Sequence, residues 1–176
     1  MLLNEYVTKY EVNPLTMAIL PKENENGVTN AYVLEETQEY IAHTTPTKMI
    51  DYACKFFGSS LRGRLDGTKD VSNITHKAPI AIDPSSGMYF FPTTSPANKN
   101  CIWIAHSHVD KIIPVEKSKT KIIFKNGKSI IVNVSFGSMQ NQMQRTAQFR
   151  FSLEHRIQQV KNPKRDEHKD DQHDEE

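Results

Sequence analysis

The alternation of apolar and polar positions predicts a chain built mainly of short strands. Residues 10–20 and 31–42 alternate in this way, and the Gly- and Asn-containing segment 21–29 between them favours an antiparallel hairpin. The Pro-rich segment 79–96 is expected to alternate short strands with turns, because Pro cannot donate to an interior ladder. Two further strands are expected over 101–106 and 111–116.

A further hairpin is the most clearly marked one in the sequence. Residues 119–124 and 129–134 have the pattern of strands, and Lys125-Asn126-Gly127-Lys128 joins them. Asn-Gly readily supplies the positive φ angles that a tight hairpin turn requires. We therefore expect these two segments to pair directly.

A short helix is predicted over about 46–57. Thr45 is a typical N-cap, Pro46 suits the first helical position, and Gly58 favours the end of the helix. Its apolar residues share one broad face, which is expected to pack on the sheet. Beyond Gly58, two more glycines among Ser, Arg and Asp predict a loose loop.

A second main helix is predicted from about 136 to 160, with an apolar arc that includes Met139, Ala147 and Ile157. Arg150 falls in the middle of this arc. Because burying an unpaired guanidinium is costly, either the helix breaks near Gln148 or Arg150 has a buried or interfacial partner.

These elements predict an α+β fold, with antiparallel β-sheet and hairpins and two main helices. A length of 176 residues suits one domain with a sizeable core, which we assign to residues 1–161. Residues 162–176 contain no aliphatic or aromatic side chain. They cannot offset the entropy of ordering and are expected to form a disordered acidic tail.

The net charge of +1 hides a strong asymmetry along the chain. Residues 1–45 have two basic residues against seven acidic ones, a net −5, whereas residues 111–165 have twelve against two, a net +10. Residues 166–176 return to −6, with one basic residue against seven acidic ones. A basic stretch of this length is typical of nucleic-acid binding, although lysines on exposed hairpins also serve solubility alone.

The lack of a visible export or membrane signal and the placement of the cysteines predict a cytoplasmic protein with no membrane partner. Met1-Leu2-Leu3 is interrupted at once by Asn4-Glu5, and no apolar run approaches the roughly 18 residues of a membrane span. Cys54 and Cys101 are far apart and sit among apolar neighbours. This pattern favours buried free thiols in a reducing compartment over a disulfide.

A series of separated motifs between residues 56 and 109 matches no general catalytic or cofactor motif. The series consists of Phe56-Phe57-Gly58-Ser59-Ser60, Arg62-Gly63-Arg64, Ala78-Pro79-Ile80-Ala81-Ile82-Asp83-Pro84, Phe91-Pro92-Thr93-Thr94-Ser95-Pro96 and Cys101-Ile102-Trp103-Ile104-Ala105-His106. With Tyr10-Glu11-Val12 upstream and Gln144-Arg145-Thr146-Ala147 downstream, it resembles the ComK family of bacterial competence transcription factors, which activate DNA-uptake genes. The resemblance covers nearly everything up to about Ile157.

The resemblance implies a transcriptional activator rather than an enzyme, with no cofactor. It implies cooperative binding, as a homo-oligomer, to paired AT-rich boxes in double-stranded DNA, largely through the minor groove and the phosphates, together with contact to RNA polymerase. Longer family members continue into an apolar C-terminal stretch that an adaptor and protease use for turnover. Here Pro163-Lys164-Arg165 leads directly into the acidic tail, which argues against turnover by that route.

Arg62-Gly63-Arg64 is the first candidate for DNA contact. In minor-groove hooks of this composition, Gly lets the backbone lie against the groove floor while two Arg side chains run along the narrow A·T groove. An ordinary basic loop has the same sequence, and the resemblance favours the hook.

The basic C-terminal half supplies the second candidate surface. The predicted DNA-binding residues are Arg62, Arg64, Lys69, Lys117, Lys119, Lys121, Lys125, Lys128, Arg145 and Arg156. Alternation along 117–121 would place three lysines on one strand face, where a phosphate backbone could lie. A Lys-fringed edge strand that only prevents aggregation is the alternative.

A self-association surface is predicted at Phe149, Arg150 and Phe151, because aromatic and Arg side chains are enriched in interface cores. An isolated basic module that binds RNA or protein remains an alternative function.

A small metallohydrolase is the other alternative. His106-Ser107-His108-Val109-Asp110-Lys111 overlaps the His-x-His-x-Asp-His ligand run of metallo-β-lactamase-type hydrolases. The final His of that run is Lys111 here, and zinc requires three or four converging donors. No metal site is therefore predicted, and His106 and His108 are expected to be packed or hydrogen-bonded histidines on a strand.

Overall fold

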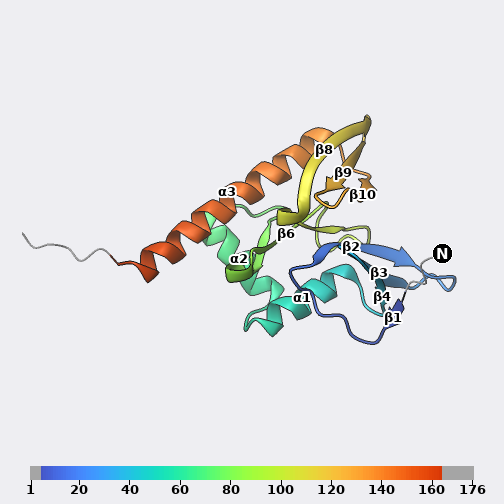
Figure 1. Cartoon of the computed structure of the whole chain (residues 1–176), viewed down its shortest axis with the longest axis horizontal. Helices are drawn as coiled ribbons and strands as arrows, with labels where there is room; N and C mark the ends of the chain where they lie inside the picture. Colours follow the sequence, from blue (N-terminus) through green and yellow to red (C-terminus); the bar gives the residue numbers. More distant parts are fainter. Residues whose placement is uncertain (1–4, 164–176) are drawn as a thin grey trace, which may run out of the picture.

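The computed structural model describes residues 5–163 (Figure 1). The strands are Glu5–Val7 (β1), Thr16–Glu23 (β2), Thr29–Glu35 (β3), Glu39–Ala42 (β4), Ile80–Asp83 (β5), Met88–Pro92 (β6), Trp103–Ala105 (β7), Val109–Glu116 (β8), Lys119–Phe124 (β9) and Ser129–Val132 (β10). The helices are Pro46–Phe56 (α1), Leu61–Ser72 (α2) and Phe136–Lys161 (α3), with 3-10 turns at Pro84–Ser86 (η1) and His106–His108 (η2). The predicted α+β class is confirmed, with one helix more than predicted.

The strands form two sheets. The larger has seven strands in the order β1-β4-β3-β2-β7-β6-β5, and only the β1–β4 pairing is parallel within the described residues. The smaller sheet has the order β10-β9-β8 and is antiparallel throughout. The antiparallel pairing of β9 with β10 confirms the hairpin predicted at 119–134.

The seven-stranded sheet has a hydrophobic core on each face, because successive residues of a strand point to opposite sides. Val33 and Trp103 belong to the core beneath α1 and α2, while their neighbours Leu34 and Ile104 belong to the core beneath β9 and α3. The molecule is therefore layered: helices α1 and α2, then the large sheet, then the small sheet together with α3 (Figure 1).

Helix α1 begins after its predicted cap, and α3 begins at the predicted residue 136. The Thr45 hydroxyl accepts the Lys48 amide at 3.3 Å, and the Ser135 hydroxyl accepts the Ser138 amide at 3.3 Å. α3 continues unbroken past Gln148 to Lys161, so the predicted alternative of a helix break is wrong. The acidic tail lies outside the described residues beyond Pro163.

Helix α2 corrects the predicted loop after Gly58. Ser60 caps it by accepting the Gly63 amide at 3.0 Å, and Asn73 ends it in the left-handed conformation. Leu61 and Leu65, four residues apart, pack against the core shared with α1. Packing of this apolar pair outweighs the low helix propensity of the two glycines inside the helix.

The strands near the N-terminus also differ from the prediction. Residues 8–15 are not a strand, and the segment 31–42 is divided by a turn between β3 and β4. In the β9–β10 turn only Gly127 has a positive φ, whereas both central residues were expected to. The Asn126 side chain instead accepts the Lys128 amide at 3.1 Å and so stabilises the turn.

Candidate nucleic-acid interface

The three-stranded sheet and its turns gather six lysines. Lys111 lies on β8, Lys119 and Lys121 lie on β9, and the two turns carry Lys117, Lys125 and Lys128. The same segment, 109–132, contains two carboxylates, Asp110 and Glu116. We call this set of lysines the lysine surface. Figure 1 shows its sheet at the top of the molecule, on the side away from α1.

The position of β9 argues against edge protection by its lysines. β9 is the central strand of the small sheet and pairs with both neighbours, so Lys119 and Lys121 do not protect a sheet edge. They alternate with the buried residues Thr120, Ile122 and Phe124 and therefore lie on the outward face. Lys117 lies in the turn before β9, so the three lysines do not share one strand face as predicted.

Among residues 5–163, most of the lysine surface has no counterion. Lys119 pairs with Glu116 at 3.7 Å. Within residues 5–163, the other five lysines make no ion pair. Lys111 belongs to this surface but not to the predicted set. The strand register places Lys111 opposite Ile123 of β9, a pairing that the sequence pattern alone does not specify.

Two of the predicted DNA-binding arginines are held by the protein itself. Arg145 donates to the His76 carbonyl at 2.6 Å and to the Gln142 side chain at 2.9 Å. Arg156 is ion-paired with Asp70 of α2 at 2.8 Å. Both contacts tie α3 to the α2 side of the molecule, which gives these arginines a structural role.

The Arg62-Gly63-Arg64 segment forms the first turn of α2 and not the predicted loop. A Cβ on Gly63 would lie 2.8 Å from the Ser59 hydroxyl, so the glycine is explained by the tight helix start. Arg64 is half-buried and donates to the Ile82 carbonyl at 3.2 Å. Arg62 and Lys69 are exposed on α2 and remain predictions as DNA contacts.

Arg150 has an intramolecular partner, which was one of the two alternatives left open. Its guanidinium lies over the Tyr89 ring, 4.9 Å from the centroid, and pairs with Glu154 at 2.9 Å. Phe149 is buried against the same ring, whereas Phe151 is 72% exposed. The three residues therefore do not share one exposed surface, which corrects the predicted self-association site.

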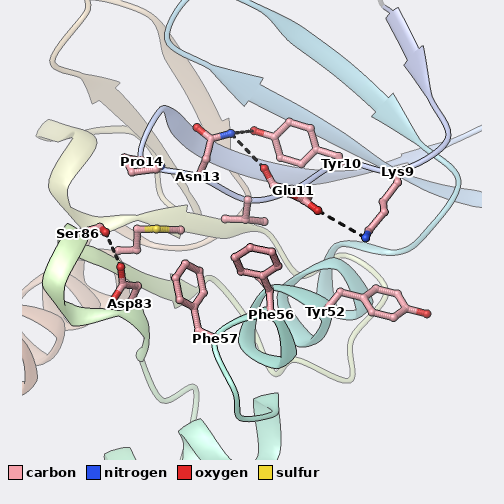
Figure 2. Close-up of a pocket in the computed structure, with 13 residues that line it drawn as sticks. Lys9, Tyr10, Glu11, Asn13, Pro14, Tyr52, Phe56, Phe57, Asp83 and Ser86 are labelled. Atoms are coloured by element: carbon pink, nitrogen blue, oxygen red, sulfur yellow. Dashed lines mark hydrogen bonds and ion pairs between the residues drawn. The ribbon is translucent and has the colours of Figure 1, made fainter.

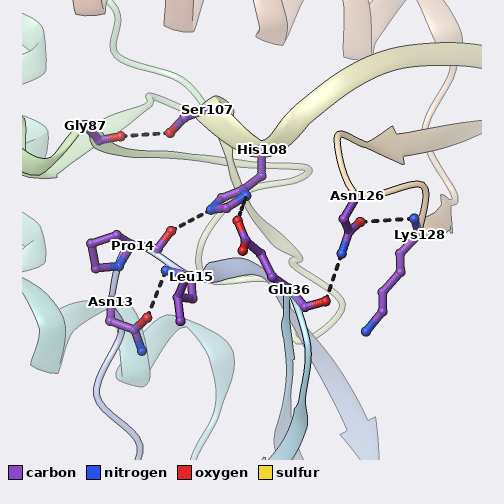
Figure 3. A network of polar contacts seen from close by, with 9 residues as sticks. All are labelled: Asn13, Pro14, Leu15, Glu36, Gly87, Ser107, His108, Asn126 and Lys128. Carbon is purple, nitrogen blue, oxygen red and sulfur yellow. Dashed lines mark hydrogen bonds and ion pairs between the residues drawn. The ribbon is translucent and has the colours of Figure 1, made fainter.

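His106 and His108 lie in the 3-10 turn η2 rather than on a strand. One ring nitrogen of His108 is 2.6 Å from the Pro14 carbonyl, and the other is 3.5 Å from a Glu36 carboxylate oxygen (Figure 3). The Glu36 carbonyl in turn accepts from the Asn126 side chain at 3.0 Å. These contacts connect the two sheets, and residues 5–163 contain no group of three potential metal ligands.

The thiols are free and buried, as predicted for Cys54 and Cys101. Burial raises the pKa of Cys54 to about 12 and also raises the pKa of Cys101. Both therefore stay protonated near neutral pH, which does not suit a thiolate nucleophile.

An aromatic groove lies at the C-terminal end of α1 (Figure 2). It has a volume of about 380 Å³, and Tyr52, Phe56 and Phe57 line it together with residues 9–14. Asp83 and the Lys9–Glu11 pair also line it, so it has no excess of positive charge. This groove does not suit a phosphate backbone, in contrast to the lysine surface.

Comparisons with known proteins agree with the resemblance seen in the motifs. The family model described as ComK protein matches residues 7–158. The competence transcription factor of Bacillus subtilis (strain 168) is 39% identical over 148 residues, which cover 84% of this chain and 77% of that protein. No solved structure matches. Within the described residues, no helix has the length and apolar character needed to cross a membrane.

Proposed function

This chain belongs to the ComK protein family, and from that premise we propose that it is a DNA-binding regulator of competence transcription. The lysine surface carries the proposal, because five of its six lysines make no ion pair within residues 5–163. Unpaired lysines on a rigid sheet can exchange their bound counterions for DNA phosphates without breaking internal contacts.

The turn lysines are the phosphate contacts in this proposal. Lys117 lies at one end of the β8–β9–β10 sheet, and Lys125 and Lys128 lie in the turn at the other end of β9. Lys117 and Lys125 are exposed, and Lys128 is half-buried. β9 has six residues and spans roughly 20 Å, so these lysines could contact phosphates on both sides of a groove.

The preference for paired AT-rich boxes and the contact with RNA polymerase are part of the proposal. The family premise supports both, and transcription in vitro from templates with and without paired A/T tracts tests them.

Self-association is also proposed. Phe151, stacked on His155 with ring centroids 6.2 Å apart, is the exposed member of the predicted trio that such an interface could use.

A salt titration of DNA affinity tests the phosphate contacts. The triple variant Lys117→Gln/Lys125→Gln/Lys128→Gln should bind an AT-rich duplex more weakly. Its slope of log affinity against log salt should be shallower by about 0.9 for each phosphate that the variant no longer neutralises. Fluorescence anisotropy between about 50 and 200 mM salt measures both quantities.

The matched control neutralises Lys9, Lys22 and Lys48, which lie in the acidic N-terminal part of the chain or at the start of α1. It removes the same charge and should leave the salt slope close to that of the unmodified protein. Equal losses in the two triple variants would show that net charge alone drives binding. Stronger binding of single-stranded RNA than of duplex DNA would favour the alternative of an RNA-binding module.

A further inference from the structure

The lysine surface carries charge that the described residues leave largely unpaired. Five of its six lysines make no ion pair within residues 5–163. The lysines of β9 point away from the buried side chains of Ile122 and Phe124, so they lie on the outward face of the small sheet. When no DNA is bound, this face is available to any other polyanion of suitable length.

The most concentrated run of negative charge in the sequence is residues 166–176, which we call the acidic segment. It has seven acidic residues against one basic residue and lies outside the residues that the structure describes. Eleven residues span at most roughly 36 Å when extended, whereas β9 spans roughly 20 Å between the turns that carry Lys117 and Lys125. The segment therefore matches the lysine surface in charge and is long enough to cross it.

The other acidic region, residues 1–45, is less suited to this role. Its charge is spread over a longer stretch, and part of it is engaged within the fold. Glu35 is buried and accepts a hydrogen bond from the Tyr10 hydroxyl at 2.5 Å. A Glu36 carboxylate oxygen lies 3.5 Å from a ring nitrogen of His108. Charge complementarity therefore favours the acidic segment as the occupant of the lysine surface.

Helix α3 carries the acidic segment away from the lysine surface of its own chain. Met143 is the last α3 residue that packs in the core beneath β9, and about 27 Å of helix separate it from Lys161. Figure 1 shows α3 ending at the opposite end of the molecule from β9. Residues 164–176 span at most roughly 45 Å, and they would have to return along α3 and pass around the small sheet. Only the last residues of the segment could therefore reach their own lysine surface.

The end of α3 is open to a second molecule, since residues 158–163 are all exposed. We propose that the acidic segment of one copy docks on the lysine surface of a second copy and competes there with DNA. The competition rests on the proposed DNA-binding function, whereas the docking does not. Duplex DNA carries one charge per roughly 1.7 Å of its axis, against about one carboxylate per 5 Å of the extended segment, so DNA displaces the segment.

Cross-linking of the full chain with a carbodiimide tests the docking, because this reagent joins a carboxylate to an amine only where the two are in contact. Mass spectrometry should find links from the acidic segment to Lys117, Lys125 and Lys128, and an excess of AT-rich duplex should remove them. Links to the remote lysines of residues 1–48 should be much weaker. Equal linking to those remote lysines, or no links at all, would overturn the proposal.

A mixture of two variants shows whether the contact joins two copies. The lysine variant is Lys117→Gln/Lys125→Gln/Lys128→Gln, and the acidic-segment variant replaces all seven acidic residues of 166–176 by Asn or Gln. Neither variant alone should link the segment to these three lysine positions. The mixture should restore the links, because one variant supplies the carboxylates and the other supplies the lysines. Links that occur in the unmodified protein but not in the mixture would show that each chain binds its own segment, which would overturn the proposal.

The competition is measured as DNA affinity. Asp170→Asn/Asp171→Asn/Asp174→Asn should strengthen binding to the duplex roughly fivefold, as expected for the loss of three exposed ion pairs, and the gain should shrink as the protein is diluted. The matched control Glu11→Gln/Glu23→Gln/Glu25→Gln removes the same charge from exposed N-terminal positions and should change the affinity little. Equal gains in both variants would assign the effect to net charge and overturn the competition.

The outcomes separate this inference from the function on which it rests. If the unmodified protein binds no duplex, the proposed DNA-binding function fails, and the cross-links still decide whether the docking occurs. If the protein binds duplex DNA and no cross-links join the acidic segment to the lysine surface, only the inference fails.

Discussion

Four of the five arginines on α2 and α3 differ from the lysines of the small sheet in what surrounds their charges, although both groups lie in basic segments of the sequence. The fifth arginine, Arg62, is exposed. Arg64, Arg145, Arg150 and Arg156 each contact a backbone carbonyl, a carboxylate or an aromatic ring of the protein itself. Five of the six lysines have no such ion pair in residues 5–163.

The chemistry of the two side chains explains this difference. A guanidinium is planar, carries five donors and is weakly hydrated, so it can satisfy carbonyls at the junction between helices and sheet. An ammonium is compact and strongly hydrated, and it stays at the surface on a flexible stem. In this protein the arginines mainly hold the elements together, whereas the lysines are available to a polyanion.

Replacing Arg150 by Met should have the largest effect on stability among the changes considered below. The substitution keeps an unbranched side chain over Tyr89 but removes the cation–π contact and the pair with Glu154. We expect the free energy of unfolding to fall by about 1–2 kcal/mol, with no change in the mass found by sedimentation. Urea denaturation at constant m-value measures the loss.

The control for Arg150 is Phe151→Ser, one residue further along α3. Phe151 is 72% exposed, so this change should alter the free energy of unfolding by less than about 0.5 kcal/mol. If Arg150→Met unfolds with unchanged free energy but sediments with a smaller mass, Arg150 belongs to an interface between copies. The distinction between structural arginines and free lysines would then fail for Arg150.

A smaller effect is expected from pH, through His106. Burial, followed by the nearby charges of Arg150 and Lys125, lowers the pKa of His106. The folded state therefore favours the neutral imidazole, and the unfolded state binds more protons between the lowered pKa and the ordinary value of about 6.5. Stability from this group is present above about pH 6.5 and is lost as the pH falls through that window.

Urea denaturation at several pH values measures this dependence. His106→Gln removes the titrating group, so its stability should fall less between pH 7.5 and pH 5.5, chosen to span roughly the histidine range. A variant with the same pH dependence as the unmodified protein would assign the loss of stability to other titrating groups. The charges of Arg150 and Lys125 beside His106 would then not contribute to the pH dependence.

The elements that the sequence predicted well are those with local signals. Thr45 and Ser135 mark the starts of α1 and α3, and Asn126-Gly127 marks the β9–β10 hairpin. α2 was missed because its glycines lower helix propensity, and its stability comes from Leu61 and Leu65 packing on residues that are distant in sequence.

In the candidate site, too, local features were predictable from the sequence, and contacts between distant residues were not. Clustered lysines were visible in the sequence, but the central position of β9 depends on the pairing of β8, which the sequence pattern does not specify. The partners of Arg145 and Arg150 are His76 and Tyr89, each about sixty residues or more away in sequence, so no local pattern could reveal them. Counting basic residues therefore predicted the segment but not the side chains that are free to bind.

The smallest effect is expected for the ion pair between Arg156 and Asp70. Its side chains are 51% and 78% exposed, and water screens such pairs strongly. A double-mutant cycle with Arg156→Gln and Asp70→Asn should give a coupling of at most about 1 kcal/mol in the free energy of unfolding.

Because Asp70 holds Arg156 against α2, Arg156→Gln should also leave DNA affinity nearly unchanged. Asp70→Asn provides the control, since it frees Arg156 and removes a negative charge, and it should strengthen DNA binding slightly. If Arg156→Gln weakens DNA binding as much as a change of Lys125 does, Arg156 belongs with the lysine surface and the two groups are not distinct.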